Sequence, residues 1–347
     1  MSQYKILSID GGGTRGIIPA TILDCIYRET GKHPTDIFSL LAGTSTGGIL
    51  CTGLAFGKST QEMVSLYLDK SDEIFYDTGW DDIRDGFGKN LGADYSNKKF
   101  KRILEDIFGD ATLHDIYQKV GEDTNLMVCS FDLNPEEGGK PINFRPKVLH
   151  SHFIRDMQVK LADLCLMTSA GPTYFPIYQN KYVDGGVSLN NPAMAALAYA
   201  INAGESDVAE YRHPNGVKKG LGKELSDLKI LSIGCGTSNK NFIPADEIRK
   251  KDKGDWGNLQ WVKYLPDLLT ESNVQASNYY VSQLLPDDRY KRLQLFFNEA
   301  DAPAAIRNKT MGLDVKDAKL LKAMKSYAEA LCAKEMDNIL DFLDLNN

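Results

Sequence analysis

The ten residues LAGTSTGGIL at 41–50 carry a G-x-S-x-G pattern between a run of apolar residues and an apolar helical segment. This pattern is typical of a nucleophile elbow, a tight strand-to-helix turn that exposes a serine at the start of the helix. The run DIFSLLAG at 36–43 predicts the buried strand, and the helix is expected to extend to about Phe56. Glycines on both sides of Ser45 give the turn the room it needs. The stretch therefore predicts a strand-turn-helix unit with Ser45 as a candidate nucleophile.

Similar units follow one another along the chain and indicate the fold class. Further strands are predicted at 4–10, 125–133, 181–186 and 228–238, with helices at 156–170, 191–202 and most of 60–110. Strands that alternate with helices predict an α/β fold with a mostly parallel central sheet flanked by helices. Residues 77–96 are rich in Asp and Gly and predict a surface loop or lid. From 258 onward we expect a mainly helical part, with one strand candidate at 289–297.

The glycine loop GGGTRG at 11–16 lies between the first predicted strand and a helix. Its G-x-G-x-x-G spacing fits a dinucleotide-binding fingerprint, but that site also needs an acidic residue at the end of the next strand. Asp36 has the required spacing but precedes its strand, which argues against a dinucleotide. Consecutive small residues before a helix can also turn N–H groups toward a developing oxyanion. An oxyanion hole and a simple tight turn are the two interpretations that remain open.

The group that would activate Ser45 is not obviously a histidine. The chain has five histidines, at 33, 114, 150, 152 and 213, and each lies in a setting typical of a surface or structural residue. In α/β-hydrolases the elbow follows several strands and the histidine comes after the last ones, which is not the order here. A partly desolvated carboxylate can take the role of base. Asp184 in YVDGG is the best candidate, and its rival Asp10 in SIDGG is expected to cap the glycine loop.

Composition and charge exclude several classes of protein. With 347 residues, of which 42% are hydrophobic, the chain can bury a large core. The formal net charge of −7, without a dense basic cluster, predicts no nucleic-acid partner. Six scattered cysteines without a C-x-x-C pair predict reduced core thiols. A strand pattern that begins at residue 4 leaves no room for a signal peptide, so we expect a cytoplasmic protein.

Three motifs in order closely resemble the patatin-like phospholipase family: DGGGTRG at 10–16, GTSTGG at 43–48 and DGG at 184–186. TSAGPTYFP at 168–176 and YVDGGVSLNNPA at 182–193 are also similar to that family. The resemblance implies a three-layer sandwich with a catalytic domain over 4–240, and residues 241–347 are expected to be a mainly helical extension packed on the same domain.

The same resemblance implies a lipid acyl hydrolase that uses a Ser-Asp dyad without histidine. Ser45 would be the nucleophile and Asp184 the base. Gly11, Gly12 and Gly13 would form the oxyanion hole, with Arg15 supporting that loop. No cofactor or metal is required by this chemistry, and the substrate would be a phospholipid or another acyl lipid.

Other interpretations stay open at this point. A transacylase or thioesterase would use the same dyad with another acyl donor or acceptor. A storage, defence or ligand-sensing protein would carry the dyad as a secondary feature. The segment LQWVKYLPDLL at 259–269 predicts either a peripheral membrane contact or ordinary core packing, and core packing is the preferred expectation.

Overall fold

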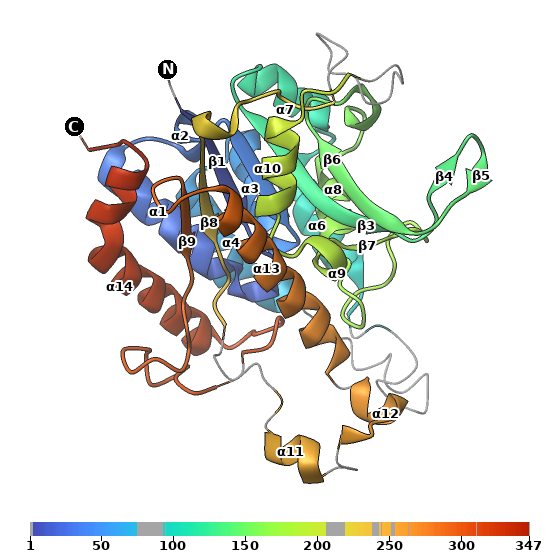
Figure 1. The fold of residues 1–347 in the computed structure, drawn as a ribbon, viewed down its shortest axis with the longest axis vertical. Coiled ribbons are helices and arrows are strands. Elements are labelled where there is room, and N and C mark those ends of the chain that lie inside the picture. Colours follow the sequence, from blue (N-terminus) through green and yellow to red (C-terminus); the bar gives the residue numbers. More distant parts are fainter. Residues whose placement is uncertain are drawn as a thin grey trace.

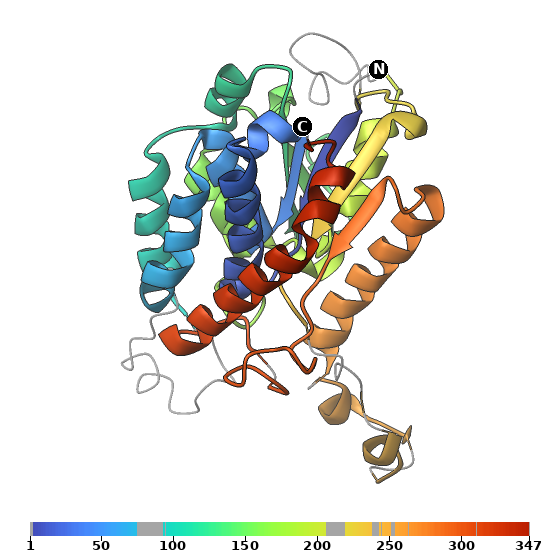
Figure 2. The same cartoon turned by 90° about the vertical axis from the view of Figure 1, so that its left-hand side faces the viewer.

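The computed structural model describes residues 3–74, 93, 95–205, 219–237, 243, 245–250, 254–262, 264–309 and 311–346. Within them a single large sheet runs through the centre of the molecule, with helices on both sides (Figures 1 and 2). The predicted α/β fold with a helical C-terminal part is thereby confirmed.

The strand order in the sheet is β6-β3-β2-β1-β8-β9, and β7 pairs with β3 off this path. All neighbouring pairs from β3 to β9 are parallel, whereas β6 and β7 run antiparallel to β3. The sheet is therefore mostly parallel, as predicted. The bounds are β1 Tyr4–Ile9, β2 Leu40–Thr44, β3 Asn125–Asp132, β6 Arg145–His150, β7 Tyr182–Asp184, β8 Leu228–Ile233 and β9 Tyr290–Leu293, with a separate hairpin of β4 Glu136–Glu137 and β5 Lys140–Pro141.

Both faces of the sheet are buried, which explains why its strands are continuous apolar runs. Side chains of β1 alternate, so that Leu7 and Ile9 enter the larger core while Ile6 enters the smaller one. The helices are α1 Ile17–Thr30, α2 Pro34–Ile37, α3 Thr46–Phe56, α4 Thr60–Ile74, α6 Asn97–Phe108, α7 Leu113–Val120, α8 Leu161–Ser169, α9 Gly186–Leu189, α10 Ala193–Ile201, α11 Ala245–Lys250, α12 Asn258–Trp261, α13 Leu265–Leu284 and α14 Ala318–Phe342. Helices α10 and α13 cover the smaller core, and α1, α3, α4, α6, α8 and α14 contribute to the larger one.

Two predicted elements begin later than expected. The strand predicted at 36–43 begins at Leu40, because His33 caps a short helix that Pro34 starts and the Asp36 carboxylate accepts from the His33 N–H. The helix predicted at 156–170 begins at Leu161. Here the Asp156 carboxylate accepts from the His150 N–H at 3.0 Å and holds a separate turn. Most of the loop or lid predicted at 77–96 lies outside the described residues.

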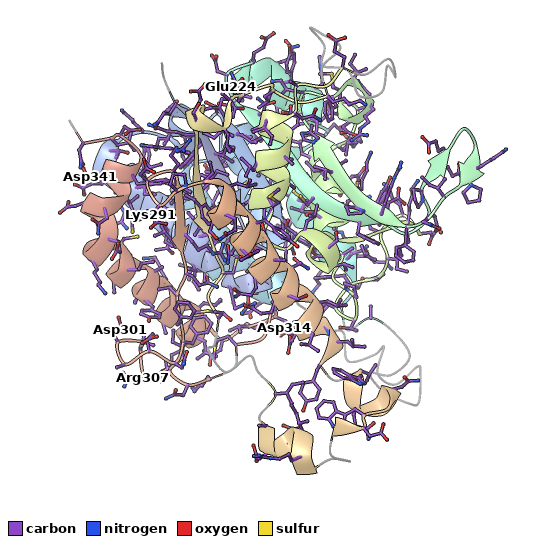
Figure 3. The ribbon with its side chains drawn as sticks, viewed as in Figure 1. Glu224, Lys291, Asp301, Arg307, Asp314 and Asp341 are labelled. Atoms are coloured by element: carbon purple, nitrogen blue, oxygen red, sulfur yellow. The ribbon has the colours of Figure 1, made fainter. Side chains whose placement is uncertain are left out.

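The C-terminal part adds to the sheet and to both helical layers. Strand β9, within the predicted 289–297, forms the parallel edge next to β8. Helix α14 packs along α1, and α13 packs against α10. The loop between β9 and α14, on which Figure 3 labels Asp301, Arg307 and Asp314, lies at the end of the molecule from which α11 and α12 project.

The preferred expectation of core packing at 259–269 is wrong. Trp261, Val262, Leu265, Leu268 and Leu269 are all exposed. The buried side chains of α13 lie further along the helix, at Val274, Ser277 and Val281. The beginning of α13 extends beyond the sheet, as Figure 2 shows, so its apolar side chains do not enter the cores on either face of the sheet.

No helix within the described parts of the chain is long and apolar enough to cross a membrane. All six cysteines fall in these parts, and each is a buried free thiol.

Candidate active site

Ser45 is the single residue between β2 and α3. Its backbone dihedral angles, φ 54° and ψ −123°, lie in a region that residues other than glycine rarely adopt. Glycine is required around it. A Cβ at Gly43 would overlap the Gly47 carbonyl, and a Cβ at Gly47 would overlap the Ile9 carbonyl. The close approach of three backbone segments therefore imposes the glycines of the G-x-S-x-G pattern, and the elbow presents Ser45 at the N-terminus of α3.

Thr168 on α8 holds this elbow in place. The Ser45 N–H donates to Thr168 Oγ1 at 2.8 Å, and the Thr168 hydroxyl in turn donates to the Cys129 carbonyl of β3. The strained turn is thus tied to a neighbouring strand and helix. The sequence analysis did not select Thr168, although Thr168 is the first residue of TSAGPTYFP, a segment that resembles the family.

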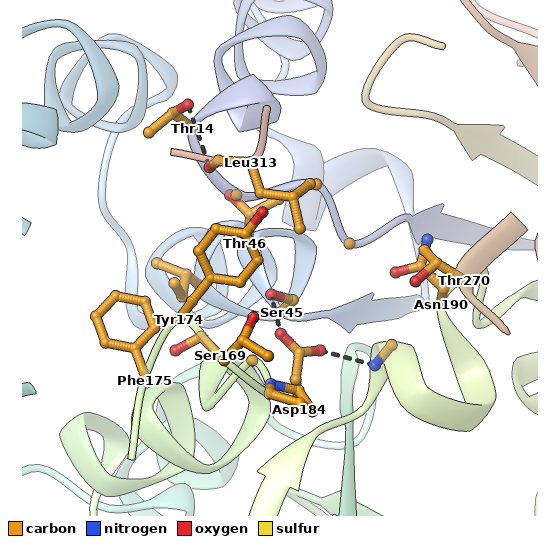
Figure 4. Close-up of a pocket in the computed structure, with 18 of the residues that line it drawn as sticks. Thr14, Ser45, Thr46, Ser169, Tyr174, Phe175, Asp184, Asn190, Thr270 and Leu313 are labelled. Atoms are coloured by element: carbon orange, nitrogen blue, oxygen red, sulfur yellow. Dashed lines mark hydrogen bonds between the residues drawn. The ribbon is translucent and has the colours of Figure 1, made fainter. Parts of the chain in front are cut away.

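The sheet register brings Asp184 to Ser45. Thr44 of β2 pairs with Cys129 of β3, and the next β3 residue, Ser130, pairs with Asp184 of β7. Because β7 is antiparallel to β3, Asp184 reaches the site from a side strand and not from one of the parallel strands. The Ser45 hydroxyl donates to Asp184 Oδ2 at 2.6 Å (Figure 4).

Burial is the main influence on the proton affinity of Asp184. It raises the pKa of this carboxyl from its ordinary value to about 6, against the opposing effect of two hydrogen bonds. These come from the Ser45 hydroxyl and from the Gly186 N–H, which donates to Oδ1 at 2.7 Å. A carboxylate in contact with a hydroxyl and with a pKa near neutrality can accept the proton of that hydroxyl.

The glycine loop lies against Ser45. A Cβ at Gly11 would lie 3.2 Å from the Cβ of Ser45 and would overlap the Asn190 side chain. The Gly11 N–H donates to the Asn190 carbonyl at 3.0 Å. For the described residues no hydrogen bond is formed by the N–H of Gly12 or Gly13.

Arg15 and Leu313 fix the loop from two sides. Arg15 donates through Nε to the Gly12 carbonyl at 3.3 Å and through Nη1 to the Gly236 carbonyl at 3.0 Å. The Thr14 N–H donates to the Leu313 carbonyl at 2.8 Å. A Cβ at Gly13, where φ is 58°, would overlap that same carbonyl. The structure therefore brings together all six residues that the sequence selected: Ser45, Asp184, Gly11, Gly12, Gly13 and Arg15.

Comparison with known proteins identifies the family. The family model described as "Patatin-like phospholipase" matches residues 7–197, which is more than half of the chain and includes the elbow, the glycine loop and Asp184. The chain belongs to the patatin-like phospholipase family. Membership supports lipid acyl hydrolase activity. Patatin-12 of Solanum tuberosum is 27% identical over 323 residues, covering 84% of this chain and 76% of the relative. Patatin-like protein 2 of Oryza sativa subsp. indica is 29% identical over 337 residues, covering 85% and 77%.

Solved structures show more distant similarity to this patatin-like chain. VipD from Legionella pneumophila has a TM-score of 0.41 and 12% identity, covering 99% of this chain and 79% of that one. Human GIVD cytosolic phospholipase A2 has a TM-score of 0.44 and 10% identity, covering 99% and 60%.

In the patatin-like chain Asp10 does not cap the glycine loop, contrary to expectation. Its carboxylate receives two hydrogen bonds from the Arg292 guanidinium, at 2.8 and 2.5 Å. Arg292 lies on β9 and also donates to Ser232 Oγ at 2.8 Å. Asp10 is buried and the Arg292 side chain is 16% exposed, and the pair is located where the glycine loop leaves β1. Arg292 lies about a hundred residues after the last segment that resembles the family, and no local pattern connects it to Asp10.

Helix α13 holds the segment that follows Asp184. Asn273 donates to the Gly186 carbonyl at 3.1 Å and accepts from the Asn190 N–H at 2.7 Å. It therefore positions both the N–H that binds Asp184 and the carbonyl that binds Gly11. No motif marks Asn273 in the sequence.

A cavity of about 260 Å³ opens above the Ser45 and Asp184 side chains. Its lining is mainly apolar and comes from separate parts of the fold. The α4 and α6 side contributes Leu66, Ile74 and Phe100, and the α13 side contributes Leu265 and Leu269. Together with the glycine loop at its floor, the cavity offers an apolar slot that leads to a hydroxyl and a carboxylate.

The described histidines lie elsewhere in the patatin-like chain. His33, His114, His150 and His152 do not line this cavity, and His213 lies outside the described residues. His33 caps α2, while His150 and His152 are buried beside aromatic rings. His114 is half-buried and stacks on Tyr117, so all four have surface or structural settings, as the sequence predicts.

Proposed function

We propose that the chain is a lipid acyl hydrolase of the phospholipase A or lysophospholipase type, with Ser45 and Asp184 as its catalytic dyad. The observation that carries this proposal is the 2.6 Å hydrogen bond from the Ser45 hydroxyl to Asp184 at the floor of an apolar cavity. Membership of the patatin-like phospholipase family supports the substrate class. The alkyl chain of a fatty-acyl ester would occupy the slot with its carbonyl at Ser45.

In the first half-reaction Asp184 accepts the proton of Ser45 Oγ while this oxygen attacks the ester carbonyl. The tetrahedral oxyanion would be stabilised by the glycine loop. Because the Gly11 N–H already binds Asn190, we assign the oxyanion to the Gly12 and Gly13 N–H groups, with Gly11 providing close approach to Ser45. Asp184 then returns its proton to the leaving alcohol, and the fatty-acyl group stays on Ser45.

In the second half-reaction a water molecule loses its proton to Asp184 and attacks the acyl-enzyme carbonyl. The same N–H groups would bind the second oxyanion, and Ser45 Oγ leaves with the proton from Asp184. The fatty acid is released and the dyad is restored. Every step uses groups of the chain and water, so the proposal assigns no cofactor.

The proposal places the catalytic domain at 4–240 and treats 241–347 as an extension packed on the same domain. Its partners are acyl lipids, with peripheral contact at membranes and a cytoplasmic location. The six buried free thiols support a reducing compartment. The apolar lining of the cavity supports a lipid substrate.

A fluorophosphonate probe and an ester assay test the nucleophile. The probe should label the peptide that contains Ser45 in the wild type, and Ser45→Ala should lose both the label and about 10⁴-fold or more of its turnover of phosphatidylcholine. Ser59→Ala is the matched control, because Ser59 is an exposed serine that lies outside the cavity. Labelling of another serine, or turnover retained in Ser45→Ala, would contradict the proposal. Labelled acyl chains recovered on an added alcohol in place of free fatty acid would identify a transacylase.

A further inference from the structure

The junction of α12 and α13 exposes a group of large apolar side chains. We call it the apolar corner and define it by five residues: Trp261, Val262, Leu265, Leu268 and Leu269. Val262 is 64% exposed and Leu269 is 51% exposed. Both views show α12 projecting from the body of the molecule (Figures 1 and 2). A concentrated apolar patch on a protruding element marks a surface that meets another apolar body.

Aromatic rings support the base of this corner. Trp256 packs edge-on to Trp261 with ring centroids 5.4 Å apart, and it stacks on Tyr264 at the same centroid distance. Tryptophan and tyrosine are the residues that gather at membrane–water boundaries, since each has an apolar ring and a polar atom. The composition of the corner therefore matches a lipid boundary in both its aliphatic and its aromatic members.

The corner continues into the cavity above the dyad. Leu265 and Leu269 belong to both, since they are exposed on the corner and also line the cavity together with Leu66 and Phe100. An alkyl chain that leaves a lipid surface at the corner could reach Ser45 along apolar side chains. This continuity is the reason for choosing a lipid surface, and not a second copy of the chain, as the occupant.

Charge on α13 indicates which lipids would bind. Asp267 and Glu271 lie on the same helix as the corner and are not fully buried. The surrounding sequence, 246–271, has six acidic and five basic residues and so no basic excess, and the whole chain has a formal net charge of −7. A negatively charged lipid surface would repel these carboxylates. A zwitterionic surface would not, so attachment would depend on burial of apolar area and little on salt.

We propose that the apolar corner docks the protein on zwitterionic lipid surfaces, with the side of the cavity that Leu265 and Leu269 line facing the bilayer. The proposal rests on the lipid acyl hydrolase function given above. It assigns attachment to Trp261, Val262 and Leu268, which lie outside the cavity lining, and chain entry to Leu265 and Leu269.

Sedimentation with phosphatidylcholine vesicles tests the corner. The double variant Val262→Gln/Leu268→Gln should bind these vesicles about tenfold or more weakly than the wild type, because two exposed apolar side chains are lost. Its hydrolysis of a short, water-soluble ester should stay at the wild-type rate, which also verifies its folding. Tyr279→Ser is the matched control, since Tyr279 is 61% exposed on the same helix three turns from Leu268, and it should bind as the wild type does.

Ser45→Ala separates this proposal from the proposed function, because it should bind vesicles normally even though it has no turnover. Wild-type binding should persist when salt is raised from about 0.05 M to about 0.5 M. The proposal is overturned if the double variant binds as tightly as the wild type, or if binding requires phosphatidylserine and disappears in salt. It is also overturned if the wild type is a dimer in solution that the double variant dissociates, since the corner would then be a self-interface.

Discussion

The tripeptide Asp-Gly-Gly occurs twice next to the site, at 10–12 and at 184–186, and the two carboxylates have opposite surroundings. Asp10 follows β1 and has both oxygens bound by the Arg292 guanidinium. Asp184 ends β7, and its oxygens accept from the Ser45 hydroxyl and the Gly186 N–H. The same local sequence thus produces a structural ion pair in one place and a candidate base in the other.

The difference lies in what each carboxylate meets across the fold. Burial raises the pKa of Asp10 as well, but the Arg292 guanidinium opposes that rise and binds both carboxylate oxygens, so in the described part of the chain neither oxygen contacts a hydroxyl from which it could take a proton. Asp184 meets no cation among the described residues, so burial is opposed only by neutral donors and its pKa rises. A pattern of residue types can place a carboxylate at a strand end, but the partner that arrives from elsewhere in the chain determines what it does.

The largest expected difference between the two carboxylates is their effect on turnover. Asp184→Asn should lower kcat for a short-chain ester about 10³- to 10⁴-fold, because the general base is lost, while the free energy of unfolding changes by about 1 kcal/mol or less. Asp10→Asn should show the opposite pattern. Its free energy of unfolding should fall clearly, while its kcat should stay at least about a hundredfold above that of Asp184→Asn. Stopped assays and urea unfolding on both variants measure the two quantities. Equal losses of turnover in folded protein would remove the distinction between the carboxylates.

The second test concerns the ion pair. Arg292→Met should lower the free energy of unfolding by about 3–5 kcal/mol, because it leaves the buried Asp10 charge without a partner. Asp10→Asn combined with Arg292→Met should be more stable than Arg292→Met alone, since the double variant buries no unpaired charge. Urea unfolding of the three proteins checks this, and a loss below about 1 kcal/mol in Arg292→Met would show that the pair contributes little to stability.

The third test concerns the hydrogen bond from the Ser45 N–H to Thr168, which holds the nucleophile elbow in place. Thr168→Val keeps the shape of the side chain but removes the acceptor for the buried Ser45 N–H, which should cost about 1–3 kcal/mol of unfolding free energy. Thr52→Val is the matched control, because Thr52 is as buried as Thr168 and its hydroxyl donates to the Gly48 carbonyl within its own helix. If both variants lose the same stability, the Thr168 hydroxyl has no special function at the elbow.

The smallest effect is the dependence of rate on pH. Asp184 must be ionised to accept a proton, and its pKa is raised to about 6, so kcat/KM should fall about tenfold for each pH unit below that value. Above pH 7 the rate should level off, because the carboxylate is already ionised there. A pH series on a short-chain ester gives the profile, with circular dichroism over the same range as a check on folding. A midpoint near the ordinary aspartate value of about 4 would indicate that burial does not control this group.

Local sequence was sufficient for much of the fold. Apolar runs that end in glycine turns predicted the strands around Leu7, Leu41, Val128 and Leu231, because strands buried on both faces leave a signal that does not depend on distant partners. Boundaries were less accurate. The helix capped by His33 and the turn held by Asp156 both occur where side-chain hydrogen bonds compete with the apolar pattern.

The sequence by itself was enough to predict an α/β fold, the elbow at Ser45 and Asp184 as the candidate base, since each prediction rests on short-range spacing that glycine and strand chemistry impose. Only the tertiary structure decided that Asp10 pairs with Arg292, that Asn273 and Leu313 fix the site, and that the apolar corner is exposed. Each of these depends on where the C-terminal part packs against the sheet and on which of its side chains remain exposed. The physical reason is that contacts between distant segments are set by packing of whole helices and strands, which leaves no local pattern in the residues that happen to touch.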